Sequence, residues 1–194
     1  MANIVLATES KYKKELFSRL NINFNCIAAH IDETAFENES AKALSCRLAE
    51  QKAVHVFDQL GEPSYVVGAD QAAECDGKIV SKPMTHEQAC EDLKRYSGKI
   101  FSFYTAVYCL SPDKTGVELM DVTKASFRHL SDAEIDRYLR KEQPYDCAGA
   151  FKSEGLGISL FDAIESQDPT ALIGLPLIQL AKFFRDQGFD LYQL

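Results

Sequence analysis

The chain has 194 residues, which allows one large domain, or two small ones, with a substantial core. Hydrophobic residues make up 46% of it and charged residues 26%, as is typical of a globular protein. The net charge of -8 at pH 7 argues against nucleic acid as a partner, because a phosphate backbone is bound by a basic surface. An anionic small molecule would need a local cluster of positive groups or a metal ion.

Nothing in the sequence predicts export, membrane insertion or a disulfide framework. No apolar run approaches the roughly 20 residues that span a bilayer, and the start of the chain lacks the basic region and the long apolar run of a signal peptide. The six cysteines include no CxxC pair and the four histidines are scattered, so no zinc-site spacing exists. We therefore expect a cytoplasmic protein without a membrane partner, in which most cysteines are small core residues.

Strands and helices alternate in the first part of the chain. A strand over residues 4–7 leads into a helix from about Ser10, and a second extended segment follows over residues 22–30. Ser40 can cap the next helix, which Gly61 ends.

A long hairpin interrupts this alternation later in the chain. A strand over residues 64–70 is followed by the Asp76-Gly77 turn, and strands over residues 99–110 and 117–128 form an antiparallel pair. The remaining signals are a helix capped by Thr85, a capping box at Ser131, a glycine-punctuated loop over residues 149–157, and Pro176 as the first residue of the last helix. This order predicts an α/β protein with a mixed sheet, in one domain spanning residues 1–194.

Asp70 follows an apolar β-type run that stops at Gly68, so we expect it at the carboxyl end of a buried strand. Ligands of open α/β sheets bind outside the carboxyl ends of the strands. An acid at such an edge, with Lys82 soon after, is a candidate for catalysis on an anionic, metal-bound substrate. The alternative is that Asp70 only begins the turn that Asp76-Gly77 completes.

Lys52 shares the apolar face of its predicted helix with Leu48 and Val56. A buried ammonium without a partner is costly, so such a lysine either extends to solvent or meets an anion. A phosphate or a carboxylate in a cleft would be the anion in the second case.

The first strand-to-helix turn suits a phosphate group. A helix N-terminus presents free backbone N–H groups, to which Thr8 and Ser10 add hydroxyls and Lys13 adds charge. The glycines of a Walker loop are absent, and a solvated, lysine-rich helix start is the alternative. Further along, Asp32 and Glu33 offer oxygen ligands of the kind that magnesium and manganese prefer, although paired acids in turns are common.

A serine hydrolase can be excluded. Ser131 and His129 are close in sequence, but no G-x-S-x-G elbow is present and Ser131 is explained as a helix cap.

Taken together, these segments resemble the Maf family of nucleoside triphosphate pyrophosphatases. Short motifs of that family occur in order along nearly the whole chain, and the ordered set is specific. The segments are Leu6-Ala-Thr-Glu-Ser10, Ile31-Asp-Glu-Thr34, Leu48-Ala-Glu-Gln-Lys52, Gly68-Ala-Asp-Gln71, Ser81-Lys-Pro83, Phe103-Tyr-Thr-Ala-Val107 and Gly174-Leu-Pro176. The resemblance implies a twisted mixed sheet flanked by helices, in two lobes with the site in a central cleft.

The resemblance also implies a role for each candidate residue. Asp70 would accept a proton from the attacking water, and Glu33 and Asp70 would hold a divalent metal cation, Mg²⁺ or Mn²⁺. The residues implied in phosphate binding are Thr8, Ser10, Lys13, Lys52 and Lys82, and those implied in base choice are Tyr12, Gln71 and Glu154.

Within the family, the chain is most similar to the branch that hydrolyses 7-methyl-GTP to 7-methylguanosine monophosphate and diphosphate, which removes a modified nucleotide from the pool. The similarity is carried by Asp70-Gln71, Phe127-Arg-His-Leu130 and Cys147-Ala-Gly-Ala-Phe-Lys-Ser-Glu154. A 7-methylguanine ring carries a positive charge, which suits the face of Tyr12 and the carboxylate of Glu154.

Two other functions stay open. One is a pyrophosphatase of the same fold acting on dTTP, UTP or ITP, and the other is a non-enzymatic regulator of septum formation in cell division. A homodimer is expected by analogy only.

The chain departs from the family pattern in two places. The N-terminal motif usually has Ser-x-Ser-Pro and then arginines, whereas Thr8, Lys11, Lys13 and Lys14 stand here. A lysine keeps the charge but lacks the bidentate fork of arginine. Ser81 replaces the usual glycine before Lys-Pro. These changes affect the expected affinity for the phosphates more than the type of reaction.

Overall fold

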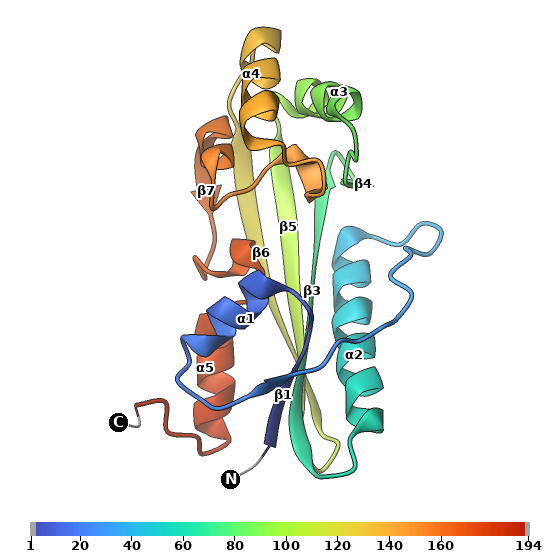
Figure 1. Ribbon diagram of the computed structural model, residues 1–194, viewed down its shortest axis with the longest axis vertical. Coiled ribbons are helices and arrows are strands. Elements are labelled where there is room, and N and C mark those ends of the chain that lie inside the picture. The colour runs from blue at the N-terminus through green and yellow to red at the C-terminus, as the bar shows by residue number, and fades with distance from the viewer. Residues whose placement is uncertain (1–2, 193–194) are drawn as a thin grey trace.

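A seven-stranded mixed β-sheet flanked by helices forms the centre of the computed structural model, which describes residues 3–192 (Figure 1). The strands are β1 (Asn3–Ala7), β2 (Asn25–Cys26), β3 (Ser64–Cys75), β4 (Lys78–Ile79), β5 (Ile100–Leu110), β6 (Gly116–Phe127) and β7 (Phe161–Glu165). The helices are α1 (Lys11–Ser18), α2 (Ala41–Gln59), α3 (His86–Tyr96), α4 (Asp132–Glu142) and α5 (Leu177–Asp186), with short 3₁₀ turns at Ala148–Ala150, Leu156–Leu160 and Ala171–Ile173. This architecture confirms the predicted fold class.

The order of the strands across the sheet is β2-β1-β3-β5-β6-β7, and β4 pairs with β3 beyond the end of β1. β1 is parallel to both β2 and β3, whereas β3, β5 and β6 are antiparallel neighbours. The three long strands run through both halves of the molecule and join them (Figure 1).

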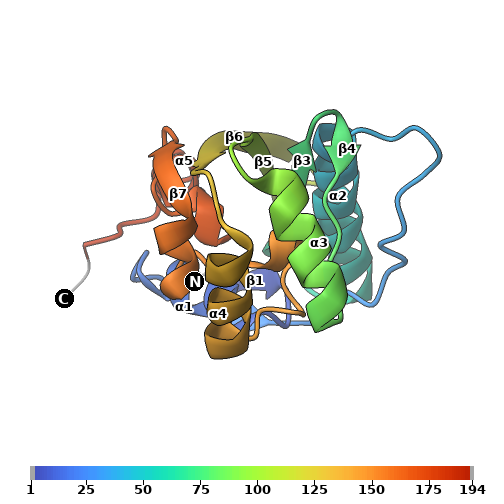
Figure 2. The same cartoon turned by 90° about the horizontal axis from the view of Figure 1, so that it is seen from above.

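Helices cover the two faces of the sheet differently. In the half that contains β1, α2 lies on one face and α1 with α5 on the other, while α3 and α4 lie at the opposite end (Figures 1 and 2). Phe17 of α1 and Phe184 of α5 are fully buried against Val67 of β3. In the far half, Tyr96 and Phe101 are the centre of a second aromatic core. The two lobes therefore have separate cores, and the lobe that contains β1 buries apolar clusters on both faces of the sheet.

Polar caps start the helices where the sequence predicts them. Ser10 accepts a hydrogen bond from the N–H of Lys13, and Ser40 and Thr85 cap α2 and α3 in the same way. Ser131 forms a full capping box with Glu134 at the start of α4. The turn between β3 and β4 also occurs as predicted, with Asp76 and Gly77 both at positive φ.

Two predictions of extent were wrong, and one strand was not predicted. The segment over residues 22–30 is mostly irregular, with only β2 as a strand. Pro176 is the N-cap of α5 rather than its first residue, because the side chains of Asp168 and Thr170 already bind the first free N–H groups of the helix. β7, within the C-terminal part of the chain, was not predicted; it is a short, largely exposed edge strand.

The cysteines are distributed differently from the prediction. All six are free thiols, but only Cys75 and Cys109 are buried, and the other four are partly exposed.

The most important correction concerns Asp70, which does not lie at the carboxyl end of its strand. β3 continues to Cys75, so Asp70 is in its middle. What ends near Asp70 is the pairing with β1, whose last partners are Ala7 and Gly68. β4 pairs with β3 only from Glu74 onward. Within the described residues, this edge of β3 has no strand beside it over residues 69–73, and side chains from both faces of the sheet can reach the gap.

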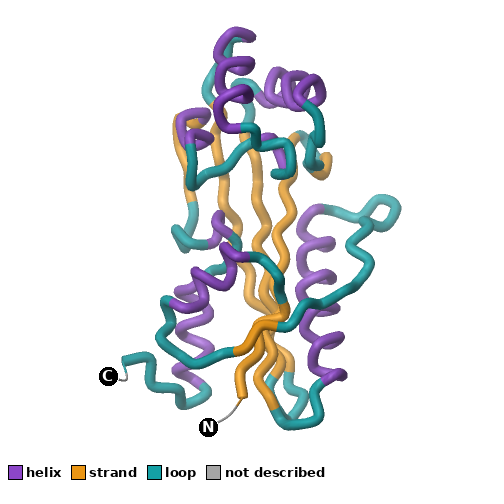
Figure 3. The backbone as a smooth tube through the Cα atoms, in the orientation of Figure 1, coloured by secondary structure: helices purple, strands orange, loops and turns teal. Residues whose placement is uncertain are grey.

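Figure 3 shows that the connection between β2 and α2 is a long loop without helix or strand. No helix among residues 3–192 combines the length and the apolar character needed to cross a bilayer.

Candidate active site

The gap at the edge of β3 opens into a cavity of about 600 Å³, a size typical of small-molecule sites. It lies between α2, the turn before α1 and the loop that follows β4. The sequence-predicted residues that line it are Thr8, Ser10, Lys13, Glu33, Lys52, Asp70, Gln71 and Lys82. Segments far apart in the sequence therefore meet at one place.

Lys52 joins two carboxylates in this cavity. Its Nζ lies 2.6 Å from Oδ1 of Asp70 and 2.7 Å from Oε1 of Glu33. The side chains of Lys52 and Asp70 are only 11% and 12% exposed, whereas that of Glu33 is 56% exposed. Burial disfavours the charge on Lys52, but Asp70 and Glu33 outweigh it, so the pKa of Lys52 is raised. Of the two alternatives for Lys52, extension to solvent and contact with an anion, the structure shows the second.

Close packing of α2 on β3 brings Lys52 to Asp70. Gly68 makes this approach possible: a Cβ added there would lie 2.1 Å from the carbonyl oxygen of Ala49 and 2.6 Å from the backbone nitrogen of Ala53. Lys52 follows one turn after Ala49 on the same helix, on the side that faces the sheet.

The turn before α1 places two hydroxyls at the cavity, and the first turn of α1 adds an ammonium. Lys13 donates from Nζ to the carbonyl oxygen of Ala69 at 2.8 Å, using an acceptor that no strand takes at this edge. Burial lowers the pKa of Lys13 to about 8, which the attraction of Asp70 only partly opposes. Thr8 and Ser10 each accept a backbone N–H, which leaves their own O–H groups as donors.

A second cavity of about 260 Å³ adjoins the first, and Gln71 and Lys82 line both. Tyr12 and Glu154, the other two residues predicted to determine base choice, line the second cavity. Both are exposed, Tyr12 at 52%. The Cys147–Glu154 segment forms much of the wall.

The sequence did not single out Thr105, which fixes the amide of Gln71. Gln71 donates from Nε2 to Oγ1 of Thr105 at 2.8 Å and to the carbonyl oxygens of Ala171 and Leu172. Thr105 is fully buried and itself donates to the carbonyl of Ala171. With its nitrogen taken by protein acceptors, Gln71 has its Oε1 left as an acceptor. The only sign of this role in the sequence was a threonine inside the apolar Phe103–Val107 motif.

Asp32 does not line the cavity, in contrast to Glu33. Its Oδ1 accepts from the backbone N–H of Thr34 at 2.9 Å and so shapes the loop. Only one acid of this predicted pair is placed toward Lys52.

The arrangement of carboxylates fits a divalent cation. Glu33 and Asp70, from different elements, already converge on one positive charge, and carboxylate oxygens are the ligands that Mg²⁺ prefers. No cluster of three or more acidic, cysteine or histidine side chains suited to a metal occurs within residues 3–192. The remaining ligands would have to be water and phosphate oxygens, as is usual for Mg²⁺ bound with a nucleotide.

The fold and the cavity together define an α/β protein with a cleft suited to a phosphorylated small molecule. Residues 3–187 match the family model described as Maf-like protein, and the chain belongs to the Maf family.

Two curated relatives align with nearly the whole chain. A 7-methyl-GTP pyrophosphatase of Xanthomonas campestris pv. campestris is 46% identical over 191 residues, covering 98% of this chain and 99% of the relative. A 7-methyl-GTP pyrophosphatase of Xanthomonas oryzae pv. oryzae is 46% identical, covering 98% of this chain and 100% of the relative.

Solved structures show the same fold at low sequence identity. The Ham1 protein of Staphylococcus aureus has a TM-score of 0.56 at 14% identity, covering 95% of this chain and 99% of its own. A HAM1 protein from Coxiella burnetii has a TM-score of 0.52 at 14% identity, covering 96% of this chain and 100% of its own. At this identity, the likeness concerns the fold alone.

Proposed function

We propose that this protein is a nucleoside triphosphate pyrophosphatase that hydrolyses 7-methyl-GTP to 7-methylguanosine monophosphate and diphosphate. The observation that carries the proposal is the convergence of Asp70, Lys52 and Glu33 in a basic-lined cavity that adjoins a second one. The first has the groups that triphosphate hydrolysis needs, and the second has room for a base. The names of the curated relatives support the choice of nucleotide.

Phosphate binding would use the basic groups of the first cavity. Lys13 and Lys82 supply positive charge, and Thr8 and Ser10 add hydroxyl donors at the N-terminus of α1. Neutralising and aligning the triphosphate is most of what catalysis of phosphoryl transfer requires.

Asp70 would act as the general base. Lys52 contacts its Oδ1, which holds the carboxylate in place and leaves Oδ2 to accept a proton from water. That water attacks the α-phosphorus, the bond from phosphorus to the α–β bridging oxygen breaks, and diphosphate leaves with the bond's electron pair. Lys52 keeps the two carboxylates together before substrate binds.

Glu33 and Asp70 would hold the divalent cation, Mg²⁺ or Mn²⁺. When bound, the cation neutralises charge on the phosphate oxygens and orients them. Lys52, held by both carboxylates, would add a further positive charge beside the phosphate oxygens.

Base selection would take place in the second cavity. The exposed ring of Tyr12 can stack on a cationic 7-methylguanine. Glu154 and the free Oε1 of Gln71 are acceptors, and the Watson–Crick edge of guanine presents N–H donors. Pyrimidines lack this combination of charge and donors.

Diphosphate release from a nucleotide panel tests the proposal. Purified protein is assayed with 7-methyl-GTP, GTP, dTTP, UTP and ITP, with Mg²⁺ or Mn²⁺ and after addition of EDTA. We expect 7-methyl-GTP to give the highest kcat/KM, with monophosphate and diphosphate as products and no turnover in EDTA. A preference for dTTP, UTP or ITP would show that this nucleotide, and not 7-methyl-GTP, is the substrate. Absence of turnover with every nucleotide would favour the non-enzymatic role in septum formation.

Two further predictions accompany this function. Light scattering of the purified protein tests the homodimer, and cell fractionation tests the cytoplasmic location.

A further inference from the structure

The segment over residues 27–40, here called the acidic loop, connects β2 to α2 and carries Glu33 (Figure 3). It contains no helix or strand, and residues 32–38 are exposed. Such segments are usually the most mobile parts of a protein. Yet Oε1 of Glu33 lies 2.7 Å from Lys52. Something must hold the loop against α2.

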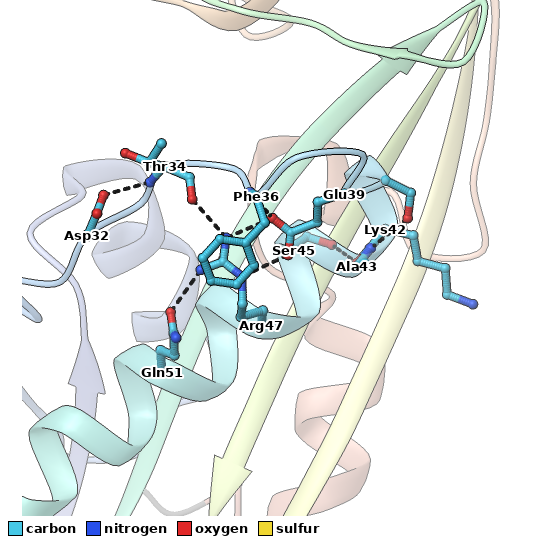
Figure 4. Close-up of polar contacts among 10 residues, drawn as sticks. Asp32, Thr34, Phe36, Glu39, Lys42, Ala43, Ser45, Arg47 and Gln51 are labelled. Atoms are coloured by element: carbon cyan, nitrogen blue, oxygen red, sulfur yellow. Dashed lines mark hydrogen bonds and ion pairs between the residues drawn. The ribbon is translucent and has the colours of Figure 1, made fainter.

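Ile31 packs against the apolar cluster of Ala41, Leu44, Leu48 and Ala72, and Arg47 on α2 makes polar contacts with the part of the loop that follows (Figure 4). Its guanidinium forms a bidentate pair with Glu39, with Nε 2.7 Å from Oε1 and one terminal nitrogen 2.8 Å from Oε2. The same terminal nitrogen donates to the carbonyl oxygen of Thr34 at 3.0 Å, and the other donates to Gln51 at 3.1 Å. The guanidinium also lies 4.0 Å from the ring centroid of Phe36.

These contacts form a built structure rather than a chance surface pair. The side chains of Arg47 and Glu39 are only 18% and 8% exposed. Oε2 of Glu39 also accepts from the backbone N–H of Phe36 at 2.9 Å, so one carboxylate links the helix to the loop backbone. Hydrogen bonding to Arg47 lowers the pKa of Glu39 to about 2, which keeps the pair ionised at any working pH.

The residues held by these contacts flank Glu33 in the sequence. Thr34 is its immediate neighbour, and the Thr34 N–H is held by Asp32 on the other side. Arg47 lies on the same helix as Lys52, little more than one turn earlier, so a single rigid element sets both the loop and the ammonium. Arg47 itself does not line either cavity of the site.

We propose that Arg47 is a positioning residue that clamps the acidic loop so that Glu33 reaches Lys52 and Asp70. Its effect on turnover rests on the proposed function, because Glu33 matters there as a ligand of the divalent cation. Its effect on the loop is independent of that function.

The activity test is a double-mutant cycle between Arg47 and Glu33. We expect Arg47→Ala to lower kcat/KM for 7-methyl-GTP about tenfold and to raise the Mg²⁺ concentration at half-maximal rate, as the loss of groups that orient metal ligands does. In a Glu33→Ala background, Arg47→Ala should change kcat/KM less than twofold, since the clamp then has no carboxylate to place. Arg47→Lys should restore little, because lysine lacks the bidentate fork.

Hydrogen exchange measured by mass spectrometry tests the clamp without any turnover. In Arg47→Ala, amides of residues 30–40 should exchange at least about tenfold faster, while those of β3 and β5 are unchanged. Glu39→Gln preserves shape and removes the ionic partner, so it should show the same pattern and serves if Arg47→Ala does not fold. Arg140→Ala is the control for loss of an arginine–carboxylate pair, because Arg140 donates through its Nε to both oxygens of Asp136 on α4, away from the site.

Each outcome decides the proposal. Unchanged exchange of the loop in both Arg47→Ala and Glu39→Gln would overturn it, and so would an equal loss of activity with and without Glu33. If the wild type hydrolyses no nucleotide but the loop loses protection in both variants, the clamp stands and the proposed function fails.

Discussion

The backbone of Ala49 lies so close to Gly68 that no side chain fits at that strand position. The carbonyl oxygen of Ala49 would be 2.1 Å from an added Cβ. This contact sets the distance between α2 and β3, and through it the 2.6 Å contact between Lys52 and Asp70. One glycine therefore links the packing of the helix to the geometry of the candidate catalytic pair.

Gly68→Ala tests this link. We expect α2 to be pushed outward, with a loss of stability of about 3 kcal/mol from overpacking and a fall in kcat of about 100-fold from displacement of Lys52. Urea unfolding and diphosphate release measure the two effects. Gly61→Ala is the matched control, since nothing lies within 4 Å of its added Cβ. Wild-type turnover in Gly68→Ala would show that the close approach is not needed.

Asp70→Asn removes the proposed base with little change in shape. We expect kcat to fall by about 10²- to 10⁴-fold, the usual contribution of a general base. The variant should also unfold at a lower urea concentration than the wild type, because the buried ammonium of Lys52 keeps only Glu33 as an anionic partner. Full activity in this variant would exclude Asp70 as the proton acceptor.

Local signals in the sequence predicted the starts of the helices and the candidate residues. A serine or threonine cap acts within one turn, so Ser40 or Ser131 is recognisable without knowledge of the rest of the fold. The apolar position of Lys52 marked this residue as unusual but left open whether its ammonium extends to solvent or meets an anion. The order of the motifs indicated the family.

The position of Asp70 could not be predicted, because it depends on where a neighbouring strand ends. β-type residues continue from Ser64 to Cys75, and nothing in them shows that pairing with β1 ends at Gly68 and that pairing with β4 begins only at Glu74. The prediction that Asp70 lies at the end of its strand was therefore wrong. β7 and the Arg47–Glu39 clamp were missed for a similar reason, since each depends on segments that come together only in the fold.

Glu154→Gln tests whether charge in the second cavity selects a cationic base. We expect the ratio of kcat/KM for 7-methyl-GTP to that for GTP to fall about tenfold, because the amide still accepts a hydrogen bond but no longer attracts the methylated ring. Turnover of GTP should change little. Glu165→Gln removes the same charge from β7, outside both cavities, and should leave the ratio unchanged. An unaltered ratio in Glu154→Gln would remove Glu154 from base selection.

The pKa of Lys13 predicts how the affinity for the nucleotide depends on pH. Burial lowers this pKa to about 8, so the free protein loses this positive charge as the pH rises through that value. We expect KM for 7-methyl-GTP to increase above about pH 8, whereas Lys13→Arg should keep KM flat into that range because arginine stays charged. Lys11→Met, on the same helix but outside both cavities, is the control. A rise in KM of equal size in Lys13→Arg would assign the titration to another group.

The same pKa predicts how the stability of the folded protein depends on pH. The Lys13 pKa of about 8 in the folded protein lies below the ordinary value of 10.5, so between these values the unfolded chain binds more protons than the folded one. The penalty for burying the charge is therefore fully present below about pH 8 and disappears as the pH rises toward 10.5. We expect Lys13→Met to raise the midpoint of thermal unfolding at pH 7 while weakening substrate binding, and to show no such gain at pH 10.5. A lower midpoint at pH 7 would mean that the contact of Nζ with Ala69 stabilises the protein more than burial of the charge destabilises it.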